Sequence, residues 1–127
     1  MYFQMKSKTV CFLYRTKTIS DADRPEMERQ RTACLLFAEE HDWIPIREFW
    51  AKEDDESESI NFSEPLIELR AGAETKKYDI LLVADFDRLG RIPQESIYAA
   101  IFFEQHRIEV WESVNGHIGA HVKKWQL

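Results

Sequence analysis

The chain has 127 residues, a length that fits one domain with one hydrophobic core. Aspartate and glutamate outnumber lysine and arginine by 23 to 17, which gives a formal net charge of −6. This balance excludes a grip on nucleic acid by bulk charge, and no apolar stretch is long enough to span a bilayer. Any contact with DNA therefore needs a local basic pocket or a separate basic module.

The ends and the cysteines give limited further information. The opening Met-Tyr-Phe-Gln is typical of the remnant of a cleavable tag, so residues 1–5 are set apart and the domain is expected to span 6–127. The two cysteines, Cys11 and Cys34, both lie in apolar sequence. Because no CxxC pair, zinc spacing or secretory signal accompanies them, we expect buried, reduced thiols, a cytoplasmic protein and no metal site.

The first half of the chain predicts a helix between two strands. Residues 8–15 form a short apolar run typical of a buried strand. Residues 25–41 have helical periodicity and begin with a proline, which suits a first helical turn. Residues 44–50 predict a second strand, and Pro45 favours an edge position or a strand start. The acidic segment 51–61 is interpreted as a solvated loop, because it lacks the glycine and spacing of an EF-hand.

The second half repeats the alternation. A helix is expected over 64–76, and the continuous apolar run 78–86 predicts a strand that is buried on both faces. A helix over 93–106 and a strand over 108–113 follow, and the tail from 114 is expected to begin another helix. Strands that alternate with helices predict a three-layer α/β domain with a mostly parallel β-sheet flanked by helices.

Two arginine-bearing segments follow predicted strands. Arg15 ends the first strand, and Asp87-Arg88-Leu89-Gly90-Arg91 follows the third. Functional sites of open parallel sheets lie at the carboxyl ends of the strands, so we expect Arg15, Arg88 and Arg91 to converge there. Planar guanidinium groups suit a phosphate, and Asp87 would fix an arginine or act on a proton. Taken alone, the five-residue segment is equally compatible with a surface turn that carries a local ion pair.

In this context the segment resembles the Asp-Arg-Leu-Gly-Arg box of the resolvase/invertase serine recombinases. The resemblance includes the aromatic residue and arginine at Tyr14-Arg15, the glutamine at Gln30, an acidic residue at Asp54 or Asp55, and Pro65 at a helix start. It covers roughly residues 8–115, and the box is its most specific part.

The resemblance implies a site-specific DNA recombinase domain that acts in DNA strand exchange and integration, often within mobile elements. In that family a serine attacks a DNA phosphodiester, and arginines stabilise the charge that builds on the phosphate. Neither a metal nor another cofactor is implied. The implied partners are DNA, bound mainly through a C-terminal region that this chain lacks, and further copies or a recombinase partner. No membrane is implied.

The match fails at the nucleophile. Where the family has arginine, one residue and then serine, this chain has Arg15-Thr16-Lys17, so Lys17 replaces the serine. Lysine cannot form a phosphoserine bond; Lys17 either contacts phosphate as a cation or is a solvated loop residue. Thr16, Thr18 and Ser20 are the nearby hydroxyls, and all three are ranked low as replacements. A family arginine before Pro65 is also replaced, by Glu64.

Two functions from different classes therefore remain. The first is a serine recombinase domain with a degenerate active site, formed by Arg15, Lys17, Asp87, Arg88 and Arg91 with Gln30 in support. The alternative is a non-catalytic α/β interaction module that regulates a recombinase or another DNA-bound partner. A small nucleotide-binding protein is set aside, because the chain has only four glycines and no glycine-rich phosphate loop. From the weak helix signal after 113 we also expect a monomer or weak dimer.

Overall fold

The computed structural model describes residues 6–18, 20–52, 64–90 and 92–118. A five-stranded sheet has the order β2-β1-β3-β4-β5, and every pairing is parallel except that of β4 with β5. The strands are β1 (Thr9–Thr16), β2 (Ile44–Lys52), β3 (Ile80–Val83), β4 (Glu109–Glu112) and β5 (Gly116–His117). The helices are η1 (Asp21–Asp23), α1 (Arg24–Glu40), α2 (Glu64–Glu74), η3 (Phe86–Leu89) and α3 (Pro93–Gln105).

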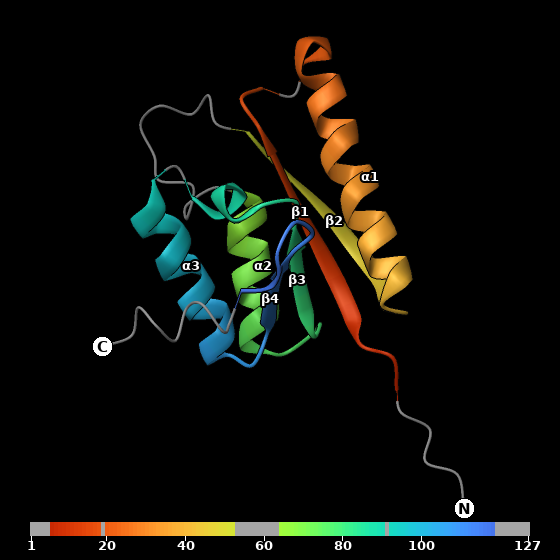
Figure 1. Ribbon diagram of the computed structural model, residues 1–127. Coiled ribbons are helices and arrows are strands. Elements are labelled where there is room, and N and C mark those ends of the chain that lie inside the picture. Colours follow the sequence, from red (N-terminus) through yellow and green to blue (C-terminus); the bar gives the residue numbers. More distant parts are fainter. Residues whose placement is uncertain (1–5, 19, 53–63, 91, 119–127) are drawn as a thin grey trace, which may run out of the picture.

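Helices cover both faces of the sheet (Figure 1). Helix α1 lies on one face, and α2 and α3 lie together on the other. The predicted three-layer α/β domain with a mostly parallel sheet is therefore confirmed. Among the helices of the described segments, none is long and apolar enough to cross a membrane.

Strand β1 is the structural centre because it has a strand neighbour on each side and a helical layer on each face. Its side chains alternate between two cores, as a strand period of two requires. Cys11 and Leu13 point into the core beneath α2 and α3, whereas Val10, Phe12 and Tyr14 point toward α1. All residues from Val10 to Thr16 are buried, which explains the continuous apolar run from Val10 to Tyr14 in the sequence.

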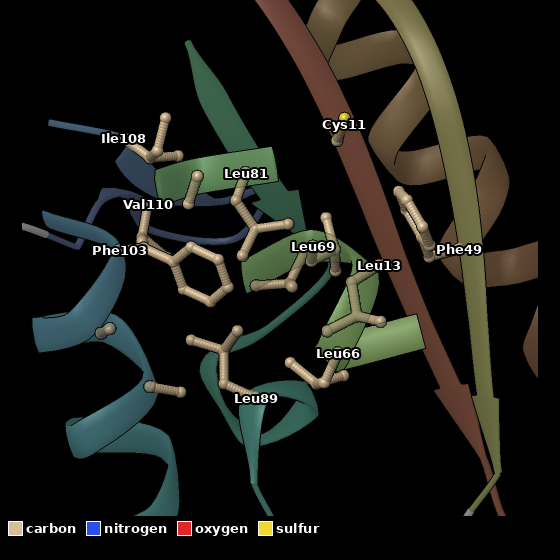
Figure 2. Packing of buried hydrophobic residues seen from close by; sticks show 14 of the residues in the cluster. Cys11, Leu13, Phe49, Leu66, Leu69, Leu81, Leu89, Phe103, Ile108 and Val110 are labelled. Atoms are coloured by element: carbon tan, nitrogen blue, oxygen red, sulfur yellow. The ribbon is translucent and has the colours of Figure 1, made fainter. Parts of the chain in front are cut away.

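The core beneath α2 and α3 joins residues that are far apart in sequence (Figure 2). Leu13 of β1 and Leu81 of β3 pack with Leu66 of α2, Phe103 of α3 and Leu89 of η3. Burial of Leu89 fixes the turn that follows β3 against this core. Asp87 and Arg88, which precede Leu89, are thereby held at the carboxyl edge of the sheet.

Most predicted elements occur within a few residues of their expected bounds. Pro93 opens α3 as expected, and β2 is an edge strand, which is a position that tolerates Pro45. Strand β3 is shorter than the predicted 78–86, because its partner β4 provides only four residues and the chain turns into η3 at Phe86.

The expected helix after 113 is wrong for the part of the tail that is described. Residues 114–118 instead form a turn and the short antiparallel strand β5. Gly116 has φ of +91°, a conformation that glycine adopts without strain, and it follows Asn115 in a sequence typical of hairpin turns.

Both cysteine thiols are buried and free, as expected. Burial raises the pKa of each thiol to about 12, because desolvation disfavours the thiolate. Neither thiol is therefore suited to act as a nucleophile in the folded protein.

Candidate functional site: an arginine cluster at the carboxyl edge of the sheet

The candidate site forms where β1 runs on beyond its neighbour β3. Pairing between these strands ends at Leu13 and Val83, yet β1 continues to Thr16. The chain after β3 bends into η3, which occupies the space beside the end of β1. Arg15 and residues 87–90 of the second arginine-bearing segment therefore lie side by side at the carboxyl edge.

Arg15 joins these two segments with its side chain. Its Nη2 donates hydrogen bonds to the main-chain carbonyls of Asp87, at 2.7 Å, and Gly90, at 2.8 Å. The residue is only 4% exposed. Both contacts are to the backbone of the box, so Arg15 fastens the turn after β3 to the end of β1.

Gln30 of α1 holds the backbone at the same point. Its amide oxygen accepts from the Arg15 N–H at 3.0 Å, and its amide nitrogen donates to the Arg15 carbonyl at 2.8 Å. The amide thus supplies the donor and acceptor that a longer β3 would have supplied. Gln30 is fully buried, and the two bonds satisfy main-chain groups that water does not reach.

Arg88 lies at the centre of the described polar contacts. Its Nη1 donates to the Arg15 carbonyl at 3.1 Å, its Nη2 to a Glu26 oxygen at 2.7 Å, and its Nε to Asp85 at 3.2 Å. Its side chain is 21% exposed. The structure thus brings Arg15 and Arg88 together at the expected edge. Arg91, the third expected arginine, lies outside the described residues.

Three charged residues at this edge were not anticipated from sequence: Glu26, Arg29 and Asp85. Arg29 of α1 binds Glu26 through two nitrogens, at 2.7 and 2.9 Å, and its Nη2 lies 3.9 Å from Asp85. The spacings Glu26–Arg29 and Asp85–Arg88 are each i,i+3, which gave a local signal for both ion pairs. The contact between Glu26 and Arg88 joins α1 to η3 and has no such signal.

The cluster favours the charged forms of its members. Hydrogen bonds from Arg29, followed by the nearby charges of Arg29 and Arg88, hold the pKa of Glu26 below its usual range despite some desolvation. The Glu26 hydrogen bond likewise raises the pKa of Arg29. At neutral pH the site therefore contains guanidinium groups that are already paired with carboxylates.

Asp87 contributes its backbone to the site. Its main-chain carbonyl receives Arg15, while the residue as a whole is exposed. The carboxylates that bind Arg88 belong to Asp85, two residues before Asp87, and to Glu26 of α1. Asp87 was expected to fix an arginine or to act on a proton. It binds Arg15 through its main-chain carbonyl oxygen.

Lys17 follows the last residue of β1 and is exposed on a bend. The strand ends at Thr16, so Arg15 and Lys17 do not share a strand face. Hydrogen bonds from the Thr18 side chain and backbone, together with the charge of Lys17, lower the pKa of Asp23. Lys17 is therefore positioned as a solvated cation beside η1.

The neighbouring hydroxyls are engaged in local contacts. Thr16 is buried, and its hydroxyl donates to the carbonyl of Thr18 at 2.5 Å. The Thr18 hydroxyl donates to Asp23 at 2.5 Å and lies 2.6 Å from the hydroxyl of Ser20. Because Asp23 has a lowered pKa, it is a poor acceptor for a proton. Of the three hydroxyl-bearing residues, Thr16 and Thr18 are at least partly buried and Ser20 is exposed.

Solved structures with the same fold belong to recombinases. The N-terminal catalytic domain of TP901-1 integrase superposes with a TM-score of 0.78 at 19% identity, covering 93% of this chain and 88% of that one. A resolvase family site-specific recombinase from Streptococcus pneumoniae gives 0.75 at 13% identity, covering 94% and 85%. The C-terminal catalytic domain of ISC1926 TnpA, an IS607-like serine recombinase, gives 0.68 at 16%, covering 92% and 77%.

No curated protein sequence matches the chain significantly. The family model described as "Resolvase, N terminal domain", in contrast, matches residues 12–119. This match spans most of the chain and includes β1 from Phe12 onward, the box at 87–91 and all the helices between them. The chain therefore belongs to the family of resolvase N-terminal domains.

Proposed function

We propose that this chain is a serine-recombinase-type domain that serves DNA strand exchange by assembly or DNA docking, and that its own active site does not cleave DNA. The single observation that carries the proposal is the residue at position 17. An exposed lysine stands where the family pattern places the nucleophilic serine. A covalent route requires a hydroxyl that can attack phosphorus, and an ammonium group cannot replace it.

The contacts of the nearby hydroxyls support the same reading. Thr16 is buried and donates to a carbonyl, and Thr18 donates to a carboxylate that has little tendency to take up a proton. A relocated nucleophile would have to leave these bonds before it approached a phosphate. Ser20 is the most exposed of the three, and it lies next to Thr18.

The test is a search for a covalent protein–DNA adduct. The protein encoded by the full natural reading frame is incubated with DNA that carries its recombination sites. The products are then separated on a denaturing gel. We expect no cleavage and no slow-migrating adduct. An adduct that disappears in Ser20→Ala, Thr18→Ala or Thr16→Ala would overturn the proposal and identify a replacement nucleophile.

The second candidate function is a non-catalytic module that regulates a recombinase partner. The burial of Arg15 favours this second function. The hydrogen bonds described for its guanidinium hold the turn at 87–90, and the residue is only 4% exposed to solvent. Mixing the chain with an active recombinase of the same element separates the two candidates. A change in the partner's strand exchange without DNA binding by this chain would support regulation, whereas DNA binding that depends on Arg88 would support docking.

A further inference from the structure

The Glu26 carboxylate lies between two guanidinium groups. One oxygen accepts from Arg88 Nη2 at 2.7 Å and from Arg29 Nη2 at 2.7 Å, and the other accepts from Arg29 Nε at 2.9 Å. The amide of Gln30 adds a longer contact of 3.2 Å to the first oxygen. A single anionic group thus receives four hydrogen bonds from three side chains.

A DNA phosphodiester presents a closely similar set of acceptors. It has one negative charge and two non-bridging oxygens, and guanidinium groups bind both carboxylates and phosphates in a planar, bidentate manner. The nitrogens of Arg88 already donate to Glu26, Asp85 and the Arg15 carbonyl. These bonds use three of the five N–H groups of the guanidinium. A phosphate that is to bridge Arg88 and Arg29, as the Glu26 carboxylate does, must displace that carboxylate.

Glu26 is the acceptor that an incoming anion can replace. Its side chain is 35% exposed and comes from the first turn of α1, so solvent and solutes reach it. The Arg15 carbonyl, in contrast, is part of β1 and is also held by Gln30. Asp85 is close in sequence to Arg88 and accepts from Nε at 3.2 Å, away from the outer nitrogens.

We propose that Glu26 is an internal substitute for the phosphodiester, which occupies the Arg29–Arg88 pair and sets the affinity of the site for DNA phosphate. The inference rests on the proposed function, because it assumes that this edge of the sheet meets DNA. Removing the charge of Glu26 takes away the anion that the two guanidinium groups share and leaves both groups in the protein. In the wild-type protein, DNA binds weakly because its phosphate competes with the Glu26 carboxylate that already occupies the Arg29–Arg88 pair.

The experiment compares Glu26→Gln with Glu28→Gln for binding to a short DNA duplex at low salt. Both variants raise the net charge by one on the same helix, but Glu28 is exposed and lies outside the contacts described for the cluster. Fluorescence anisotropy of a labelled duplex reports the Kd. We expect Glu26→Gln to bind roughly tenfold more tightly than wild type, since a charge-assisted hydrogen bond is then available to phosphate. Glu28→Gln should change Kd by about twofold or less, the effect of bulk charge alone.

Arg88→Ala, alone and combined with Glu26→Gln, separates this inference from the proposed function. The gain should vanish in the double variant, and thermal melts should show that the single variants remain folded. Equal affinities for Glu26→Gln and Glu28→Gln, with Arg88→Ala still weakening binding, would overturn the role of Glu26 and leave DNA docking intact. Binding that is absent, or unaffected by Arg88→Ala, in every variant would overturn both the role of Glu26 and DNA docking, and would leave assembly as the function.

Discussion

The amide of Gln30 offers the sharpest test of how the arginine cluster is built. Gln30→Leu keeps a similar side-chain volume and removes the two bonds to the Arg15 backbone, at 3.0 and 2.8 Å. The Arg15 carbonyl retains its bond from Arg88, but the Arg15 N–H loses the partner described for it. A buried main-chain donor without a partner costs about 1–3 kcal/mol, and the second lost bond about 1 kcal/mol. Burial of the added apolar surface returns about 1 kcal/mol, which leaves a net loss of about 2 kcal/mol.

Urea unfolding followed by circular dichroism measures this loss. For a chain of 127 residues, about 2 kcal/mol also corresponds to a fall in Tm of roughly 6–8 °C. The matched control is Gln94→Leu, the same substitution at an exposed position in the first turn of α3. This control should stay within about 0.5 kcal/mol of wild type. A Gln30→Leu protein as stable as the control would refute the idea that a side chain replaces the missing strand neighbour.

Three further outcomes follow from described contacts. Gly90→Ala should destabilise the protein by about 1–3 kcal/mol in urea unfolding, because its Cβ would lie 2.5 Å from the Glu95 Cβ and 2.6 Å from the Ser96 nitrogen; a neutral substitution would contradict the close packing of the box on α3. Cys11 and Cys34 should resist a disulfide reagent at pH 8 until denaturant is added, since burial raises the pKa of both thiols to about 12; rapid labelling of the folded protein would disprove their burial. The pKa of Glu26 is lowered on folding, so the stability that this carboxylate contributes is present above its ordinary pKa of 4.5 and is lost as the pH falls through the folded pKa. In Glu26→Gln, the free energy of unfolding should therefore fall less steeply with decreasing pH in the acid range. An unchanged pH dependence would show that the ion pairs of Glu26 add nothing to stability.

The fold was accessible from sequence because its strongest signals are local. Continuous apolar residues in β1 and β3 report burial on both faces, and the prolines at α1 and α3 mark helix starts. The hairpin at β5 was missed although Asn115 and Gly116 are typical turn residues. The poor helix formers after residue 113 were interpreted as a weak helix. They indicated instead that no helix forms in this part of the chain.

The site was accessible only in part. The resemblance to recombinases indicated Arg15, Gln30 and Arg88, and the structure brings these three into contact. The bonds they make could not be predicted, because they depend on how far β1 extends past β3. The contact of Glu26 with Arg88 joins residues 62 positions apart, and only the packing of α1 beside η3 creates it.

The burial of Arg15 has a consequence for recognising working recombinases by sequence. An arginine that binds two main-chain carbonyls is needed to hold the turn at 87–90 in place, whether or not the domain ever touches DNA. Such a residue would persist in a lineage that has abandoned cleavage, because its loss weakens the fold. The residue at position 17 does not hold the fold together in this way, since its side chain is exposed on a bend. The identity of that one exposed residue is therefore a better marker of cutting activity than the arginines around it.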